Sequence, residues 1–363
     1  MMREGWEYKK FDEVFNLQMG KTPNRKNPDY FGGKNVWISI RDLGDKEVLE
    51  SNEHITDKAV SDTNIRKVKK GTVIMSFKLT VGKCGIAAKD LYTNEAIMAF
   101  NTKEGYDINS SFLYYYLQCY NWEGSNKAVM GITLNKATIS KQHINIPPKS
   151  TQLAIVSELD KINELIRLKK EQLKDFDNLA QSIFYEMFGD PVENEKGWEV
   201  KKLGEVYKMK SGDSLSTKSF EEGDIPVYGG NGISGYHNQY NKDGSYIIIG
   251  RVGVYCGNVR IVKGRFWLTD NAFELLYDNS SQNEVFVCSL LTHLNLRQYA
   301  NAAAQPVISN NTLKHVSIPL PPLPLQHLFA HRIDQIEHQK AEVQKAITDL
   351  ETLLASRMQY WFE

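Results

Sequence analysis

The segment Gly5–Phe15 reads GWEYKKFDEVF, and Gly197–Tyr207, which begins 192 positions later, reads GWEVKKLGEVY. Each of these openings has a matching close, INIPP at Ile144–Pro148 and VSIPLPP at Val316–Pro322. An internal duplication constrains the architecture before any single element is considered. The chain of 363 residues is therefore expected to consist of two copies of one structural plan.

Between the opening and the close, the two copies diverge. The clearest match in the middle sets Gly71–Lys78 (GTVIMSFK) beside Gly244–Arg251 (GSYIIIGR). Short runs of β-branched and aromatic residues bounded by Gly, Asn and Asp predict strands in both copies, and apolar runs at 112–120 and 285–294 predict helices. Matching frames with divergent middles indicate two versions of one task, directed at two different targets.

A long helical pattern follows each close, from Gln152 to about Phe188 and from Gln326 to about Phe362. Apolar residues recur in it at alternating spacings of four and three, which is the a/d seam of a coiled coil. Each helix of about 37 residues would be ~55 Å long. The seam positions expected to pack are Leu159, Ile162, Ile166 and Leu173 in the first helix, and Ile333, Ile336, Val343 and Ile347 in the second.

The matched lengths and seams favour packing of the two helices on each other as an antiparallel coiled coil, with acidic outer faces left for other subunits. The alternative is two amphipathic helices that pack only on their own domains. Proline runs before each helix mark the turn from domain to helix. The predicted fold class is α+β with a pseudo-twofold repeat: a globular domain (1–151), a helix (152–189), a second globular domain (190–325) and a second helix (326–363).

Charge is unevenly distributed, although the chain is neutral overall. Residues 1–151 hold 22 Lys and Arg against 17 Asp and Glu, whereas residues 152–196 hold 6 against 10. Residues 197–325 are nearly balanced, and residues 326–363 are again acidic, with 4 against 6. Basic residues in Gly-, Asn- and Pro-rich loops are typical of nucleic-acid binding, because Lys and Arg neutralise phosphates while Arg, Asn and Gln read base edges.

The sequence also disfavours several kinds of site. The four cysteines form no C-x-x-C pair, so neither zinc nor a disulfide framework is expected. Gly230–Gly235 fits G-x-G-x-x-G but precedes no apolar helix, Val81–Cys84 lacks the rest of a P-loop, and no methyltransferase motif is found. Asp190 with Glu199–Lys201 resembles a nuclease acid cluster only loosely. With no signal sequence and no apolar stretch of ~20 residues, we expect a cytoplasmic protein without membrane contact, metal or cofactor.

In their order and spacing, these features resemble the specificity (S) subunit family of type I restriction-modification systems. The resemblance covers essentially the whole chain. It is carried by the two Gly-Trp-Glu-x-Lys-Lys openings, Gly71–Phe77 with Gly82 and Lys83, Ile225–Gly232, Ile318–Leu323 and the heptad helices.

The resemblance implies a non-catalytic subunit with two target recognition domains, each reading one half of a bipartite, asymmetric site in double-stranded DNA. The helices would act as a ruler and would dock two modification (methyltransferase) subunits, which bring S-adenosylmethionine and methylate adenine. Restriction subunits with ATP-dependent translocation are further partners that the resemblance allows.

Six residues are candidates for the DNA-facing surface, because they lie in loops beside glycines within the matched motifs. They are Arg41, Lys78 and Lys83 in the first domain, and Asn231, Arg251 and Asn310 in the second.

Two other functions stay open at this point. One is a recognition platform within a methyltransferase-only or nuclease-containing complex of type II character, although two repeats leave no room for a catalytic domain. The other is a coiled-coil scaffold that assembles proteins without DNA, which the weak basicity of the second domain favours. Spacer length and target sequence depend on loop geometry and DNA shape, and the sequence does not reveal them.

Overall fold

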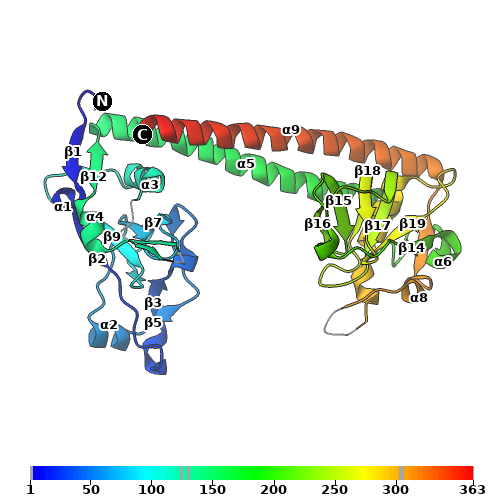
Figure 1. Ribbon diagram of the computed structural model, residues 1–363, viewed down its shortest axis with the longest axis horizontal. Helices are drawn as coiled ribbons and strands as arrows, with labels where there is room; N and C mark the ends of the chain where they lie inside the picture. The colour runs from blue at the N-terminus through cyan, green and yellow to red at the C-terminus, as the bar shows by residue number, and fades with distance from the viewer. Residues whose placement is uncertain (1–2, 123–125, 129–130, 302–305, 363) are drawn as a thin grey trace. The chain divides into compact units, whose positions relative to one another are not determined.

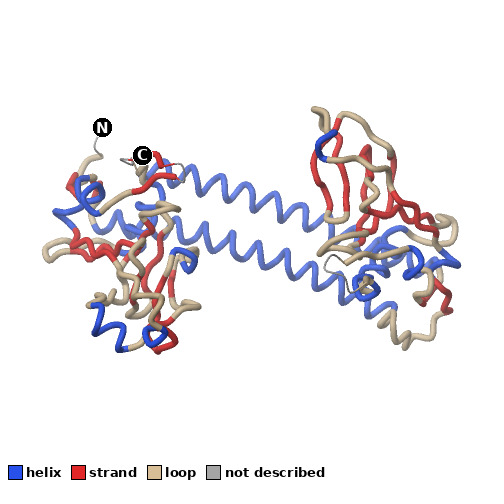
Figure 2. Tube along the Cα trace, turned by 60° about the horizontal axis from the view of Figure 1, so that its bottom comes forward, coloured by secondary structure: helices blue, strands red, loops and turns tan. Residues whose placement is uncertain are grey.

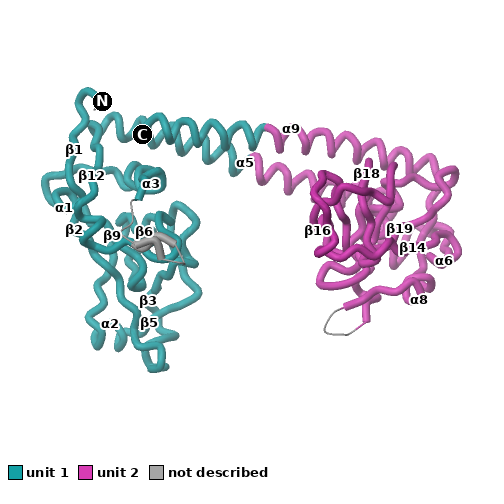
Figure 3. Tube along the Cα trace, viewed as in Figure 1, with its two compact units in different colours: residues 1–168, 346–363 teal, residues 169–345 magenta. Residues whose placement is uncertain are grey.

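The computed structural model describes residues 3–122, 126–128, 131–301 and 306–362 (Figure 1). The chain divides into two compact units, residues 1–168 with 346–363 (unit 1) and residues 169–345 (unit 2), coloured separately in Figure 3. Each unit holds one globular domain together with a segment of each long helix. Strands and short helices mix within both globular domains (Figure 2), as the α+β class predicts.

The duplicated openings and closes pair with each other as two short antiparallel ribbons. In unit 1, β1 (Glu7–Lys10) pairs with β12 (His143–Ile146), and Glu7 lies opposite Ile146. In unit 2, β13 (Glu199–Lys202) pairs with β20 (Ser317–Leu320) in the same register. Each domain is therefore closed by a strand pair whose two members are more than a hundred residues apart in sequence.

Unit 1 is built on a five-stranded sheet in the order β2-β9-β6-β7-β4, beside a three-stranded sheet in the order β5-β3-β8. The helix α3 packs its aromatic face into the core formed with the larger sheet. The strands are β2 (Phe15–Met19), β3 (Phe31–Ile38), β4 (Glu47–Val48), β5 (His54–Ile55), β6 (Val73–Ser76), β7 (Cys84–Ala87), β8 (Tyr92–Thr93), β9 (Ile97–Thr102), β10 (Asn126–Ala128) and β11 (Gly131–Thr133). The short helices are α1 (Phe11–Val14), α2 (Asp57–Thr63), α3 (Ser110–Cys119) and α4 (Lys136–Lys141), with 3-10 turns η1 (Pro28–Tyr30) and η2 (Ile40–Asp42).

Unit 2 repeats this plan with a single six-stranded sheet in the order β14-β19-β17-β18-β15-β16. Its apolar helix α7 packs on the sheet as α3 does in unit 1. The strands are β14 (Lys208–Ser211), β15 (Ile225–Gly229), β16 (Gly232–His237), β17 (Lys242–Gly250), β18 (Val259–Leu268) and β19 (Ala272–Leu276). The helices are α6 (Leu203–Val206), α7 (Glu284–His293) and α8 (Asn310–Leu313), with 3-10 turns η3 (Thr217–Ser219) and η4 (Leu296–Tyr299).

The two long helices, α5 (Lys149–Phe188) and α9 (Leu323–Phe362), have 40 residues each. Each begins three residues before the predicted start at Gln152 or Gln326. Proline explains the difference, because the first turn of a helix has free amide positions and tolerates proline. Pro148 directly precedes α5, and Pro324 lies inside the first turn of α9.

A buried glutamine ties the start of each long helix to its own domain. Gln152 and Gln326 are each 1% exposed. Their side-chain oxygens accept hydrogen bonds from the backbone amides of Asn109 and Asn283, the residues that cap α3 and α7, at 2.8 and 2.9 Å. Their side-chain nitrogens donate to proline carbonyls. Burial of an amide is costly unless it is hydrogen-bonded, and each of these two uses both its oxygen and its nitrogen, with the corresponding partners in both units.

Within each unit, the segments of α5 and α9 run antiparallel, as the seam predicts. In unit 1, Glu158 of α5 is bonded to Arg357 and to Trp361 of α9. In unit 2, Asp177 pairs with Lys340 at 2.8 Å. Six of the eight predicted seam residues are buried, and two are half-buried. The buried ones are Leu159, Ile162, Ile166, Ile336, Val343 and Ile347, and the half-buried ones are Leu173 and Ile333.

Candidate nucleic-acid interface

The loop after β6 in unit 1 and the loop after β17 in unit 2 are held by the same pattern, or frame, of backbone hydrogen bonds. In unit 1, the amide of Ser76 donates to the carbonyl of Lys83 at 2.8 Å, and the amide of Gly82 donates back to Ser76 at 3.0 Å. In unit 2, Gly250 makes the corresponding bonds, donating to Asn258 at 2.8 Å and accepting from Gly257 at 2.7 Å. These backbone bonds define the structural equivalence of the two loops, although the second is one residue longer.

The same frame corrects the sequence match at Arg251 by one position. Phe77 donates its amide to Ala96 and accepts from Leu134. Arg251 makes the matching pair of bonds, to Asn271 and from Ile308. Arg251 therefore occupies the place of Phe77, whereas the sequence match set it beside Lys78. The match relied on similar strand residues, while the strand pairings fix the register through contacts that lie far away in sequence.

Arg41 and Asn231 occupy equivalent positions. Arg41 lies three residues after Ile38 of β3, and Asn231 lies three residues after Tyr228 of β15. The carbonyls of Ile38 and Tyr228 each accept a backbone hydrogen bond of 2.9 Å, from the residue that follows the neighbouring parallel strand, β8 or β18. Both side chains are exposed. The structure thus brings an arginine and an asparagine to the same place in the two domains.

The remaining candidates, Lys78, Lys83 and Asn310, are exposed or half-buried and lie in or near these loops. Lys78 is half-buried, with its amine 5.4 Å from the ring centroid of Phe77, and Lys83 is exposed at the end of its loop. Asn310 is exposed at the first position of α8. Its segment is tied to the loop of Arg251, because the amide of Ile308 donates to the Arg251 carbonyl at 2.9 Å.

Two further side chains at equivalent positions were missed by the sequence reasoning, and so was Asn94, which lines the same cleft as Arg41. Asn258 stands where the first domain has Lys83, and Lys136 stands where the second has Asn310. The capping pattern is a signal that could have found Lys136: Asn135 caps the amide of Thr138 at 2.8 Å, as Ser309 caps Thr312 at 3.1 Å. No comparable signal marks Asn94, which lies in the divergent middle.

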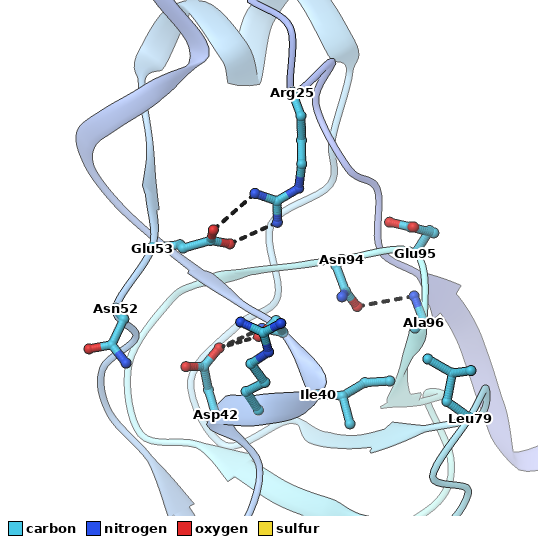
Figure 4. A pocket seen from close by; sticks show the side chains of 11 residues that line it. Arg25, Ile40, Asp42, Asn52, Glu53, Leu79, Asn94, Glu95 and Ala96 are labelled. Atoms are coloured by element: carbon cyan, nitrogen blue, oxygen red, sulfur yellow. Dashed lines mark hydrogen bonds and ion pairs between the residues drawn. The ribbon is translucent and has the colours of Figure 1, made fainter. Parts of the chain in front are cut away.

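Arg41 lines a cleft of about 590 Å³ in unit 1. Arg25, Asn52, Leu79 and Asn94 line the same cleft (Figure 4). The cleft also carries carboxylates, which limits how positive it is. The full lining is Arg25, Ser39, Ile40, Arg41, Asp42, Asn52, Glu53, Leu79, Asn94, Glu95 and Ala96.

The guanidinium of Arg25 is paired at this cleft. It donates two hydrogen bonds of 2.9 Å to the two carboxylate oxygens of Glu53 (Figure 4). Hydrogen bonding to Glu53 raises the pKa of Arg25, and the same bonds lower the pKa of Glu53. The bidentate pair holds both side chains in one geometry. Arg41, which forms no such fork among the described residues, is the cation more available to an incoming acceptor.

The guanidinium of Arg251 is held in place but incompletely bonded. Its Nη1 lies 3.4 Å from the Ser211 hydroxyl and from the Asp270 carbonyl, and its carbon lies 5.2 Å from the ring centroid of Phe273. Among the described residues its buried Nε has no hydrogen-bond partner. A planar guanidinium whose contacts through Nη1 with these two groups are both long suits a bidentate acceptor such as guanine.

We predict that Ser76→Ala loosens the loop of unit 1. Ser76 is fully buried, and its hydroxyl accepts from the Lys83 amide at 3.1 Å and donates to the Thr80 carbonyl. The variant leaves these backbone groups short of partners, so unit 1 should lose about 1–3 kcal/mol of unfolding free energy. Urea unfolding measures this loss. Ser61→Ala, at an exposed serine of α2, is the matched control, and equal losses in the two variants would contradict the prediction.

A family model described as "Type I restriction modification DNA specificity domain" matches residues 3–175 and again residues 195–352. The chain is 29% identical over 245 residues to the type I restriction enzyme MjaIX specificity subunit of Methanocaldococcus jannaschii, covering 61% of this chain and 56% of that protein. It is 27% identical over 356 residues to the EcoprrI specificity subunit of Escherichia coli, covering 91% and 87%.

Solved structures share the fold. The type I restriction-modification S subunit from M. genitalium aligns with a TM-score of 0.56 at 16% identity, over 100% of this chain and 96% of that chain. A chain from a study of type I R-M assembly and conformational transition aligns with a TM-score of 0.66 at 17% identity, over 100% and 99%. Among the described residues, no helix is long and apolar enough to cross a membrane, and no group of His, Cys, Asp or Glu is arranged to hold a metal ion.

Proposed function

The chain belongs to the family of type I restriction-modification DNA specificity domains, and from this premise we propose how its two units divide the reading of DNA. The protein confers DNA sequence specificity. Residues 1–151 form a target recognition domain for one half of a bipartite, asymmetric site, and residues 190–325 form one for the other half. The chain itself catalyses nothing, and the complex works in the cytoplasm, where bacterial and archaeal DNA lies.

One observation carries this proposal. The two domains repeat a backbone frame bond by bond, while the exposed or partly exposed side chains at equivalent places differ in chemistry. The pairs are Arg41 with Asn231, Lys83 with Asn258, and Lys136 with Asn310. At a fourth place the half-buried Arg251 stands where unit 1 has the buried Phe77. Arginine pairs with guanine and asparagine with adenine in the major groove, so one frame with different side chains reads two different sequences.

The partners follow from the family. Specificity subunits of restriction-modification systems act with methyltransferase subunits, and we propose that two of these dock along the long helices. They supply S-adenosylmethionine and the methyl transfer, and restriction subunits join them in a complete system. Exposed leucines on α5 and α9 give these helices apolar surface outside the seam: Leu165, Leu168, Leu179, Leu328 and Leu353.

The test is the methylation pattern placed by the chain together with the methyltransferase encoded beside it. Sequencing of modified bases after reaction with random DNA should give a discontinuous motif with two unlike halves. Methylation that needs only one continuous motif, or none at all, would overturn the proposed function.

We predict that Arg251→Ala relaxes one base position in the second half-site only. A good bidentate base contact is worth about 1–3 kcal/mol, so methylation at the intact site should fall roughly 5- to 100-fold. Arg265→Ala removes an exposed arginine of β18 in the same unit and is the matched control, expected to leave the motif unchanged. If Arg251→Ala instead weakens binding equally on every sequence, the arginine contacts phosphate and the base-reading role is wrong.

A further inference from the structure

The loop after β6 carries a leucine in a conformation that favours glycine. Leu79 has φ of 63°, in the left-handed region, and its side chain is 66% exposed. A bulky residue rarely adopts this conformation, and it costs free energy that the surrounding structure must offset. At the equivalent place in unit 2, three residues beyond Gly250, stands Gly253 with φ of 86°.

The frame around the loop imposes this conformation. Ser76 is bonded through its amide, carbonyl and hydroxyl to Lys83, Gly82 and Thr80, so the loop tip has little freedom to rearrange. The backbone would therefore be less strained with glycine at position 79. The leucine side chain offers no compensating burial, because two-thirds of it faces solvent. Its use must lie outside the folded domain.

The equivalent loop of unit 2 also exposes apolar side chains, from the residues that follow its glycine. Val254 and Tyr255, which directly follow Gly253, are 62% and 50% exposed. Neither loop contains an acidic residue: the first reads FKLTVGK (77–83) and the second RVGVYCGN (251–258). Both tips therefore combine an exposed apolar group with neighbouring positive charge, from two lysines in unit 1 and from Arg251 in unit 2. This combination suits a polyanion with an apolar interior better than it suits a protein surface.

We propose that Leu79 in unit 1, and Val254 with Tyr255 in unit 2, are wedges that insert against base-pair steps of the two half-sites. The base stack is the apolar surface that DNA offers, and proteins kink DNA by pressing apolar side chains between steps. Leu79 lines the same cleft as Arg41, so a base-reading candidate lies beside the wedge. This inference rests on the proposed function. It adds unstacking of DNA, which the partner enzyme needs because a base is modified only after it leaves the stack.

The first experiment uses Leu79→Gly in the full complex with its methyltransferase. Glycine relieves the strained φ, so the melting temperature should stay equal or rise, while the wedge is lost. Affinity for duplex containing the first half-site should fall roughly 5- to 100-fold. Fluorescence of 2-aminopurine placed in that half-site should no longer increase on binding, because the step stays stacked. Leu49→Ala, at a leucine of the same domain that is 59% exposed, is the control and should leave both the affinity and the fluorescence change as they are.

The second experiment uses Val254→Ala with Tyr255→Ala. This double variant should lose the 2-aminopurine signal in the second half-site and keep it in the first. Leu79→Gly should show the reverse pattern. A variant that changes both half-sites equally would contradict the assignment of one wedge to each domain.

Three results would overturn the inference. They are unchanged affinity with Leu79→Gly, an unchanged 2-aminopurine signal, and loss of the methyltransferase subunit on size-exclusion chromatography with residual DNA affinity intact. The last result would show that the tips contact protein. Failure of the proposed function looks different, because the unsubstituted complex would then place no methyl groups at a discontinuous motif.

Discussion

Replacing Lys242 by alanine should lower the free energy of unfolding of unit 2 by about 3–5 kcal/mol, because it leaves a buried carboxylate without its partner. Lys242 begins β17 and forms an ion pair with Glu274 of β19. Their side chains are only 14% and 7% exposed. The lysine amine also lies 5.2 Å from the ring centroid of Tyr246. Hydrogen exchange of the β17 and β19 amides in increasing urea measures the loss in unit 2 directly.

Two companion variants make this prediction sharp. Arg265→Ala breaks the pair with Asp243 on the neighbouring strands, where both side chains are more than half exposed, and should cost less than about 1 kcal/mol. The double change Lys242→Met with Glu274→Leu removes both charges together and should be nearly neutral. If Lys242→Ala costs no more than Arg265→Ala, the ion pair does not hold this sheet together.

Phe184→Ala should cost unit 2 about 3–5 kcal/mol, since it removes a fully buried aromatic ring from the core. Phe184 belongs to α5, and its ring stacks on His293 of α7 with centroids 4.0 Å apart. It also meets the edges of neighbouring rings, including Phe329 of α9 at 5.8 Å. One side chain therefore joins α5 to both helices that pack against it in this unit.

The matched control for Phe184→Ala is Leu179→Ala, five residues earlier on the same helix, where the side chain is 46% exposed. It should cost less than about 0.5 kcal/mol. Thermal unfolding of the two variants, followed by near-ultraviolet circular dichroism, compares them. A difference below 1 kcal/mol would mean that α5 is held on this unit by contacts other than the aromatic cluster.

Much of the fold was predictable because its signals are local. The heptad spacing of Leu159, Ile162 and Ile166 needs only one helix to be seen, and the repeated openings need only the chain itself. The ribbon between Glu7 and Ile146 was not predicted, although both of its motifs had been identified. Strand pairing over such a separation depends on the folded domain between the strands, which periodicity does not describe.

The sequence predicted which loops carry the candidate site, but it did not predict which residues of the two domains are equivalent. Arg41 and Asn231 were chosen separately, and the structure makes them equivalents through bonds to β8 and β18. The separation between equivalent residues is 190 positions there and 174 at Phe77 and Arg251, because the intervening segments differ in length. A single sequence offset therefore cannot find both pairs. Nothing in the sequence singled out Leu79, because what distinguishes it is its positive φ angle.

The two ribbons that close the domains also bear on how such a protein can change. In each domain the chain enters and leaves on adjacent antiparallel strands, β1 with β12 and β13 with β20. The chain between the two strands of a ribbon therefore begins and ends at neighbouring positions. Domains whose ends lie close together in this way can be inserted into another protein without disturbing its fold. Recombination at these two strands would exchange a whole globular domain while the buried glutamines and the helices stay as they are. A new domain can then be acquired in one genetic event, without a series of partly altered sequences that would each have to fold.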